Sequence, residues 1–399
     1  MSDSGVEVIV RPHAPTRPAT GARARLLFVD NLRWMVILLV ISMHAADTYS
    51  PLGNWYFVDR APVSPSTLLV FAVWQMYLQS FFMGLLFLLA GAFLPGALAR
   101  KGPTGLVAER LFRLGLPVLF YMLVLGPITE YFVAHSWTST LPTTFANEWL
   151  KHLYNGEVLQ ENGPLWFCLA LLIFSLVYVL WHRLTPGSPP LTATKPPGSA
   201  ALAGFALAMA AGTFLTALVL PGDGVLLNMH LRDFPQYVLM FGAGIAAGNQ
   251  GWLTCLDGRA AFWWVTIVLP VGFVLWLSVL IGGGVLESGG HTLTGWHWQA
   301  AAFDLWQGFT CVALALGMLA LFRARFNTQG PVARFLSANA FSVYVFHPPI
   351  LILVARGLAL VHVHVLLKFA TLTAVAALAS FVLSATVFRR IPGLRTILS

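Results

Sequence analysis

The stretch LLFVDNLRWMVILLVISMHAAD, residues 26–47, decides the fold. It is long and apolar enough to cross a bilayer as one α-helix, since about 20 apolar residues span the hydrocarbon core. Four of its side chains are charged or titratable, namely Asp30, Arg33, His44 and Asp47. Such groups are costly within a membrane and indicate function by default. The stretch therefore predicts a membrane protein and also predicts where its chemistry lies.

The composition of the whole chain agrees with a membrane protein. Of its 399 residues, 58% are hydrophobic and 10% charged, whereas soluble domains are about 45–50% apolar and about 25% charged. This excludes a soluble enzyme, a secreted disulfide scaffold and a disordered chain. The net charge of +8 is attributed to loops that face the cytoplasm, so the lipid bilayer is expected as a partner and nucleic acid is not.

Apolar runs long enough to span a bilayer recur along the chain. Because they are continuous rather than alternating, they predict helices and not barrel strands. The fold class expected is an all-α polytopic membrane protein of about ten transmembrane helices, over residues 26–47, 66–94, 111–133, 164–182, 201–220, 234–249, 262–281, 301–322, 335–355 and 365–388.

Loop charges predict the topology of these ten spans. With the N-terminus inside, seventeen Lys and Arg residues fall in inside segments and five fall outside, as the positive-inside rule requires. Both termini are then cytoplasmic. We expect a disordered tail over residues 1–22, a membrane domain over 23–390 and a C-terminal tail over 391–399, in a multi-pass protein of the inner (plasma) membrane.

Within the first span, Arg33 and His44 are eleven residues apart. That spacing is three helical turns plus about 20°, so the two side chains share one face about 16 Å apart along the axis. A basic residue near the inner surface and a titratable base further out suit a path across the bilayer. Asp47 follows His44 by three residues and could orient its imidazole. Arg33 as an anchor, His44 as an interfacial histidine and Asp47 as a solvated helix-end residue remain alternatives.

Arg110 and Arg113 form an R-x-x-R pair before the third span. At this spacing they share one helix face, and two guanidinium groups together could clamp a phosphate or pyrophosphate. The alternative is ordinary anchoring of the helix at the cytoplasmic surface.

His347 lies near the middle of the ninth span, directly before Pro348 and Pro349. Prolines free backbone carbonyl groups, which must find other partners inside the bundle, as is common where a helix lines a polar cavity. A simple buried histidine is the alternative.

Aromatic residues are concentrated in the outer loops, Trp55 among them, and Glu130 ends the third span at the outer face. The aromatic residues fit either an interfacial belt or a platform for sugar rings. No spacing of Cys and His indicates a metal site, and we expect Cys168, Cys255 and Cys311 in the core.

Four stretches resemble the acyltransferase-3 family of integral membrane O-acyltransferases, and within it the branch typified by glucan biosynthesis protein C. The first is VDNLRWMVILLVISMHA (residues 29–45), with its R-x10-H spacing. The others are ERLFRLGLP (109–117), GPLWFCLALL (163–172) and FSVYVFHPPIL (341–351). The match covers nearly the whole chain beyond the tail.

The resemblance implies ten helices and an acyltransferase. The donor would be cytoplasmic acyl-CoA, with no permanently bound cofactor, and an acyl group of the acetyl or succinyl type would pass to a hydroxyl of an extracytoplasmic glycan or related acceptor. His44 matches the catalytic histidine, as a general base or as a transient acyl carrier. Arg33, Arg110 and Arg113 match positions tied to donor handling.

Other roles and functions stay open. Trp166 or His347 could bind substrate or donate to the oxyanion, beside Trp55 and Glu130 as candidate acceptor contacts. A transporter of a small molecule or a lipid-linked sugar is the alternative function, since it too would place charges along a crossing path. A scaffold is a third, although it has no need of titratable groups in the first span.

Overall fold

A computed structural model describes residues 25–53, 55–59, 62–134, 144–159, 161–185, 195–220 and 224–398. The tail expected over residues 1–22 lies outside these ranges. Within them the chain is almost entirely helical, and the strands are one short antiparallel hairpin, β1 (Val225–Leu226) and β2 (Met229–His230).

The helices bear out the all-α fold class, and each of the ten expected spans falls on helical chain. The α-helices are α1 (Leu27–Tyr49), α2 (Pro65–Arg110), α3 (Leu116–Phe120), α4 (Gly126–Ile128), α5 (Phe145–Tyr154), α6 (Trp166–Leu184), α7 (Ser199–Val219), α8 (Phe234–Gln250), α9 (Gly258–Leu277), α10 (Trp298–Arg325), α11 (Pro331–Ala359), α12 (Val365–Thr386) and α13 (Pro392–Ile397).

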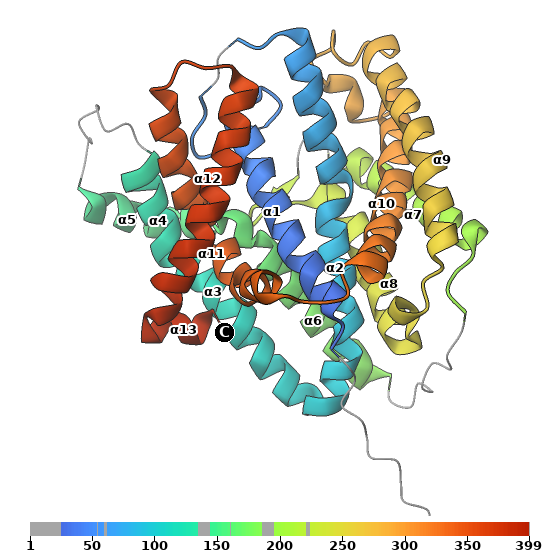
Figure 1. The fold of residues 1–399 in the computed structure, drawn as a ribbon, viewed down its shortest axis with the longest axis horizontal. Helices are drawn as coiled ribbons and strands as arrows, with labels where there is room; N and C mark the ends of the chain where they lie inside the picture. The colour runs from blue at the N-terminus through green and yellow to red at the C-terminus, as the bar shows by residue number, and fades with distance from the viewer. Residues whose placement is uncertain are drawn as a thin grey trace, which may run out of the picture.

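Eight helical segments of the described chain are long and apolar enough to cross a membrane. The expected second and third spans share one of them, Pro65–Tyr131, which bends at Gly102, where φ is +69°. Figure 1 shows the two parts of this segment meeting at the bottom of the molecule. There α2 ends, and the chain reverses direction and runs back up through α3 and α4. The expected sixth span is α8, whose 17 residues make it shorter than the eight.

Helix α1 lies inside the bundle, packed against α2, α10, α11 and α12 (Figure 1). Its start is fixed by Asn31, whose Nδ2 donates to the carbonyl groups of Phe326 and Thr328 beyond α10. Arg25 and Leu398 line one cavity, so the two ends of the described chain lie on one face. A topology with both termini inside requires this arrangement.

Glycines allow α2 and α8 to approach closely. A Cβ atom on Gly244 would overlap the carbonyl oxygen of Leu88, and one on Gly248 would overlap that of Ala92. Small residues at such positions let two backbones pack against each other in a bilayer, where apolar burial alone does not hold helices together. This contact secures the short α8 to the rest of the bundle.

One expectation from the sequence needs correction, and one helix was not predicted. Cys168 and Cys311 are buried, but Cys255 is exposed because it lies in the turn after α8, so a core position was wrong for it. The outer connection between α4 and α6 contains α5, an amphipathic helix whose first turn Thr144 caps by accepting a hydrogen bond from Asn147.

Candidate functional site

Two cavities of similar size lie between α1, α2, α6 and α11. Following the topology expected from the loop charges, we call the one that His44 lines the outer cavity and the one that Arg33 lines the inner cavity. Their volumes are about 640 Å³ and about 620 Å³ respectively. Of the predicted residues, His44, Asp47, Trp55, Trp166 and Glu130 line the outer cavity.

His44 and Asp47 are paired, as their spacing predicted. His44 Nδ1 lies 3.3 Å from Asp47 Oδ2, and the aspartate side chain is 9% exposed. A carboxylate can only accept a hydrogen bond, so Nδ1 carries the proton and Nε2 is left with a free lone pair. The outer cavity is therefore lined by an oriented imidazole base.

Gln75 supports this pair from α2. Its Nε2 donates to the other carboxylate oxygen of Asp47 over 2.7 Å, and both side chains are buried. A Cβ atom on Gly53 would overlap Asp47 Oδ1, so the glycine provides the room in which the carboxylate sits. Gln75 was not predicted from the sequence, although an amide inside the apolar run 66–94 was a signal for it.

Two rings stack on the imidazole of His44. The Trp55 ring lies 3.7 Å away with an interplanar angle of 15°, and the His347 ring lies 5.5 Å away with an angle of 14°. Both rings lie nearly parallel to the imidazole and restrict its plane. Of the two stacking residues, Trp55 lines the outer cavity and His347 lines neither cavity.

His347 instead replaces a backbone hydrogen bond that α11 lacks. Pro348 has no N–H to give to the carbonyl of Tyr344, four residues earlier, and His347 Nδ1 donates to that carbonyl over 2.8 Å. Its Nε2 is consequently unprotonated and has no partner in the described chain. His347 thus stacks on His44 without lining either cavity, and its contact with the substrate or the oxyanion stays a prediction.

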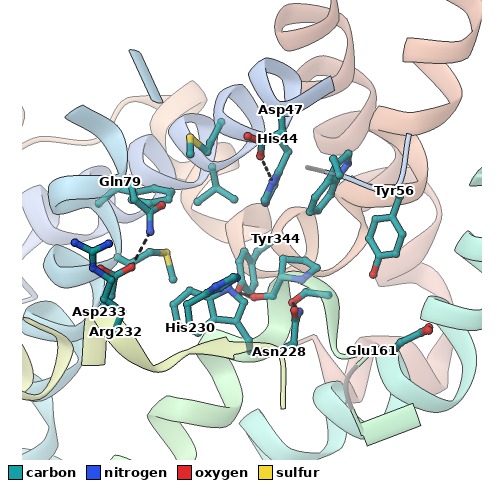
Figure 2. A pocket seen from close by; sticks show the side chains of 18 of the residues that line it. His44, Asp47, Tyr56, Gln79, Glu161, Asn228, His230, Arg232, Asp233 and Tyr344 are labelled. Carbon is teal, nitrogen blue, oxygen red and sulfur yellow. Dashed lines mark hydrogen bonds and ion pairs between the residues drawn. The ribbon is translucent and has the colours of Figure 1, made fainter. Parts of the chain in front are cut away.

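The far wall of the outer cavity is polar. Figure 2 shows His44 and Asp47 facing Asn228 and His230 across the cavity, with Gln79 and Asp233 to one side and Tyr56 and Glu161 to the other. Hydroxyl, amide, carboxylate and ring groups on several sides suit a ligand with many hydroxyl groups. Sequence spacing gave no signal for Gln79, Asn228 or Asp233, because Gln79 lies about 150 residues before the other two.

On the acidic side of this wall, Glu161 stays protonated at a higher pH than an ordinary carboxyl group. Burial, followed by the charge of Glu130 and a hydrogen bond to it, raises the pKa of Glu161 to about 8. Burial also raises the pKa of Tyr56 to about 12, and its hydroxyl lies 3.3 Å from that of Tyr121. At neutral pH these groups present hydroxyl and carboxyl hydrogens as well as acceptor oxygens.

The opposite side holds one ion pair and one carboxylate bound by amides. Arg232 Nη2 donates to Asp304 over 2.8 Å, while Asp233 accepts from Gln79 at 3.3 Å and from Gln307 at 3.2 Å. Arg232 is thus paired with the buried carboxylate of Asp304. Four acidic residues and one arginine line the outer cavity, namely Asp47, Glu130, Glu161, Asp233 and Arg232. That balance favours an uncharged ligand over an anionic one.

The inner cavity has the reverse charge. It brings together all three arginines predicted for the donor, and four arginines and one aspartate line it, namely Arg25, Arg33, Arg110, Arg113 and Asp30. Asp30 pairs with Arg25 at 2.6 Å and with Arg33 at 3.5 Å. The Arg110 Nε atom is buried without a hydrogen-bond partner in the described chain. Guanidinium groups in excess over carboxylates suit phosphate groups.

Comparison with known families identifies the family of the chain. The family model for acyltransferase-3 proteins, described as an acyltransferase domain, matches residues 26–389. No curated protein and no solved structure gives a significant match to the chain. The matched range contains all residues that line the two cavities except Arg25 and Leu398, which line the inner cavity. The chain belongs to the acyltransferase-3 family and is a membrane acyltransferase.

Proposed function

We propose that this acyltransferase moves an acyl group across the membrane, from cytoplasmic acyl-CoA in the inner cavity to a hydroxyl of an extracytoplasmic glycan in the outer cavity. The single observation that carries the proposal is the pairing of two oppositely charged cavities along α1, with Arg33 in one and His44 in the other. The placement in the inner (plasma) membrane and the branch typified by glucan biosynthesis protein C are part of the same proposal.

The charge of each cavity supports the assignment of donor and acceptor. The phosphates of CoA are anionic, and the inner cavity offers an excess of arginine, including the unpartnered Nε of Arg110. A neutral glycan has many hydroxyl groups and sugar faces, and the outer cavity offers carboxylates, amides and the rings of Trp55 and Trp166. An acetyl or succinyl group would travel on the pantetheine arm of the donor.

The reaction follows from the position of His44. Its Nε2 takes the proton of the acceptor hydroxyl while the oxygen attacks the thioester carbonyl. The carbon–sulfur bond of the tetrahedral species then breaks, and the CoA sulfur leaves with the proton from the imidazolium. Asp47, held by Gln75, stabilises that imidazolium through Nδ1. Exclusion of water from the reacting groups protects the thioester from hydrolysis.

An assay with purified protein tests this reaction. Radiolabelled acetyl-CoA or succinyl-CoA is supplied with neutral gluco-oligosaccharides, and labelled oligosaccharide is measured. We expect His44→Gln to lower kcat at least about a hundredfold, because general-base catalysis typically contributes that much. The KM for acyl-CoA should change little, since the donor phosphates bind elsewhere.

The control is His291→Gln, which changes an exposed histidine outside both cavities and should keep the wild-type rate. Thermal unfolding of both variants should match the wild type. If folded His44→Gln kept more than a tenth of the rate, His44 would not be the base.

A further inference from the structure

The two cavities come within about one helical turn of each other. On α1, Val40 lines the outer cavity and Ile37 the inner one. On α2, Met83 lines the outer cavity and Leu86, three residues later, lines the inner one. Three residues of helix rise about 4.5 Å, so the partition between the cavities is thin.

Tyr344 on α11 occupies this partition. Among the described residues it is the one that lines both cavities, and it is 4% exposed. Its hydroxyl donates to the carbonyl of Pro164, which itself lines the outer cavity. The phenol therefore closes the gap between α11 and the start of α6.

The acceptor of this hydrogen bond is firmly placed. Gly163 has a φ of +49°, and a Cβ atom there would overlap the ring of Tyr121. The carbonyl of Gly163 also accepts from Asn228 Nδ2 over 3.0 Å. The Gly163–Pro164 turn is thus fixed on two sides, and movement at the partition falls to Tyr344.

Helix α11 is weakened at the same point. Pro348 and Pro349 cannot donate to the carbonyl groups four residues earlier, on Tyr344 and Val345. The side chain of His347 supplies the donor for Tyr344, and the same imidazole stacks on His44. The Tyr344 carbonyl is therefore bound by a side chain that contacts His44, and not by the backbone N–H four residues later.

We propose that Tyr344 is a gate between the two cavities. With its hydroxyl on Pro164 the passage is closed and water is kept from the donor. When the phenol swings away, the cavities join, and the thin acyl-pantetheine arm reaches His44. The identity of the arm rests on the proposed function, whereas the gate itself rests on the geometry of the partition.

Labelling of a cysteine tests the gate without any substrate. Ile37→Cys puts a thiol in the inner cavity beside the partition, and a small membrane-impermeant methanethiosulfonate is added to the outer side of sealed proteoliposomes. Peptide mass spectrometry measures modification of that position. In the otherwise unchanged protein we expect slow modification, because the closed phenol blocks the route.

Adding Tyr344→Phe should speed this labelling about two- to tenfold. The loss of one neutral hydrogen bond increases the population of the open state by about that factor. Tyr344→Ala, which also removes the ring, should speed it more than tenfold. The matched control is Phe341→Ala, which removes a ring one turn away that lines the inner cavity alone. It should leave labelling from the outer side unchanged.

Equal labelling in the Phe, Ala and unsubstituted proteins would overturn the gate, as would equal acceleration by Phe341→Ala. Release of CoA from acetyl-CoA without acceptor is the second readout, and Tyr344→Ala should raise it several-fold. If labelling accelerates but acetyl-CoA is never consumed by any form, the gate stands and the proposed donor is wrong.

Discussion

Three contacts of different kinds fix the imidazole of His44. The hydrogen bond to Asp47 sets the tautomer, and the stacked rings of Trp55 and His347 set the plane. Gln75 adds a fourth constraint by orienting the carboxylate. A base held in this way loses little freedom on reaching the transition state, which is the advantage of a preorganised site.

Residues of the inner cavity should control donor affinity. We expect Arg110→Ala and Arg113→Ala each to raise the KM for acetyl-CoA about tenfold or more with a smaller change in kcat, because hydrogen bonds to charged groups contribute roughly 1.5–3 kcal/mol. Lys at either position should rescue only part of the loss, since an ammonium cannot form the paired contacts of a guanidinium. Initial rates against donor concentration measure this.

The matched control is Arg325→Ala at the end of α10. This arginine is exposed and lines neither cavity. Its replacement should leave the KM unchanged. Unchanged KM values in both inner-cavity variants would return Arg110 and Arg113 to the role of helix anchors.

Glu161 should make stability depend on pH. Its folded pKa of about 8 lies above that of an unfolded chain, so the folded protein holds the extra proton and loses stability as pH rises from about 4.5 to about 8. Glu161→Gln should remove much of that loss, a shift on the order of a few °C in unfolding temperature between pH 6 and pH 8.5. Thermal unfolding in detergent measures it.

The groups facing Glu161 are Glu130, Glu157 and His152, whose Nε2 lies 3.4 Å from Glu161 Oε2. Glu157→Gln is the control, because that side chain is 54% exposed and should retain most of the wild-type pH profile. A profile identical in wild type and Glu161→Gln would show that Glu161 does not hold the proton.

At the scale of elements, the close contact of α2 and α8 decides whether the short α8 stays in place. Gly244→Leu forces a side chain against the carbonyl of Leu88, and overpacking of this kind costs typically about 1–3 kcal/mol. We expect a lower unfolding temperature and lower yield. Gly242→Leu on the same helix meets open space and should be tolerated. Equal stability of the two variants would contradict the proposed packing.

The spanning helices could be predicted from the sequence because each is a long apolar run, and lipid forces such runs to satisfy their own backbone. Gly102 could not be identified as the point where two joined helices reverse direction. In the sequence, such a glycine cannot be distinguished from a glycine in an ordinary loop. The amphipathic α5 and the hairpin β1–β2 are short and lack the apolar length on which the prediction of spans rests.

The candidate site was predictable where its residues are close in sequence. His44 and Asp47 share a helix face at three residues, and Arg110 and Arg113 do likewise, so helix geometry alone paired them. Gln75 and Tyr344 act through contacts between helices distant in the chain, which no local spacing records. The catalytic and donor roles of these residues stay predictions.

At the scale of the whole molecule, charge is separated along one path. Arginines gather in the cavity near the two ends of the described chain, and carboxylates gather in the cavity beyond the Tyr344 partition. In the proposed function, the distance from Arg33 to His44, about 16 Å along α1, is covered by the acyl-bearing pantetheine arm and not by the nucleotide part of CoA. The central claim is therefore that donor and acceptor never share a side of the membrane.

Sealed proteoliposomes test that claim most directly. The exposed Cys255, expected on the cytoplasmic side, reports orientation by its reaction with an impermeant thiol reagent. Labelled acetyl-CoA is supplied on the side of Cys255 and Arg113, and gluco-oligosaccharide only on the other. We predict labelled oligosaccharide in that arrangement and none when the two substrates are exchanged. Transfer only when both substrates share one side would contradict the account.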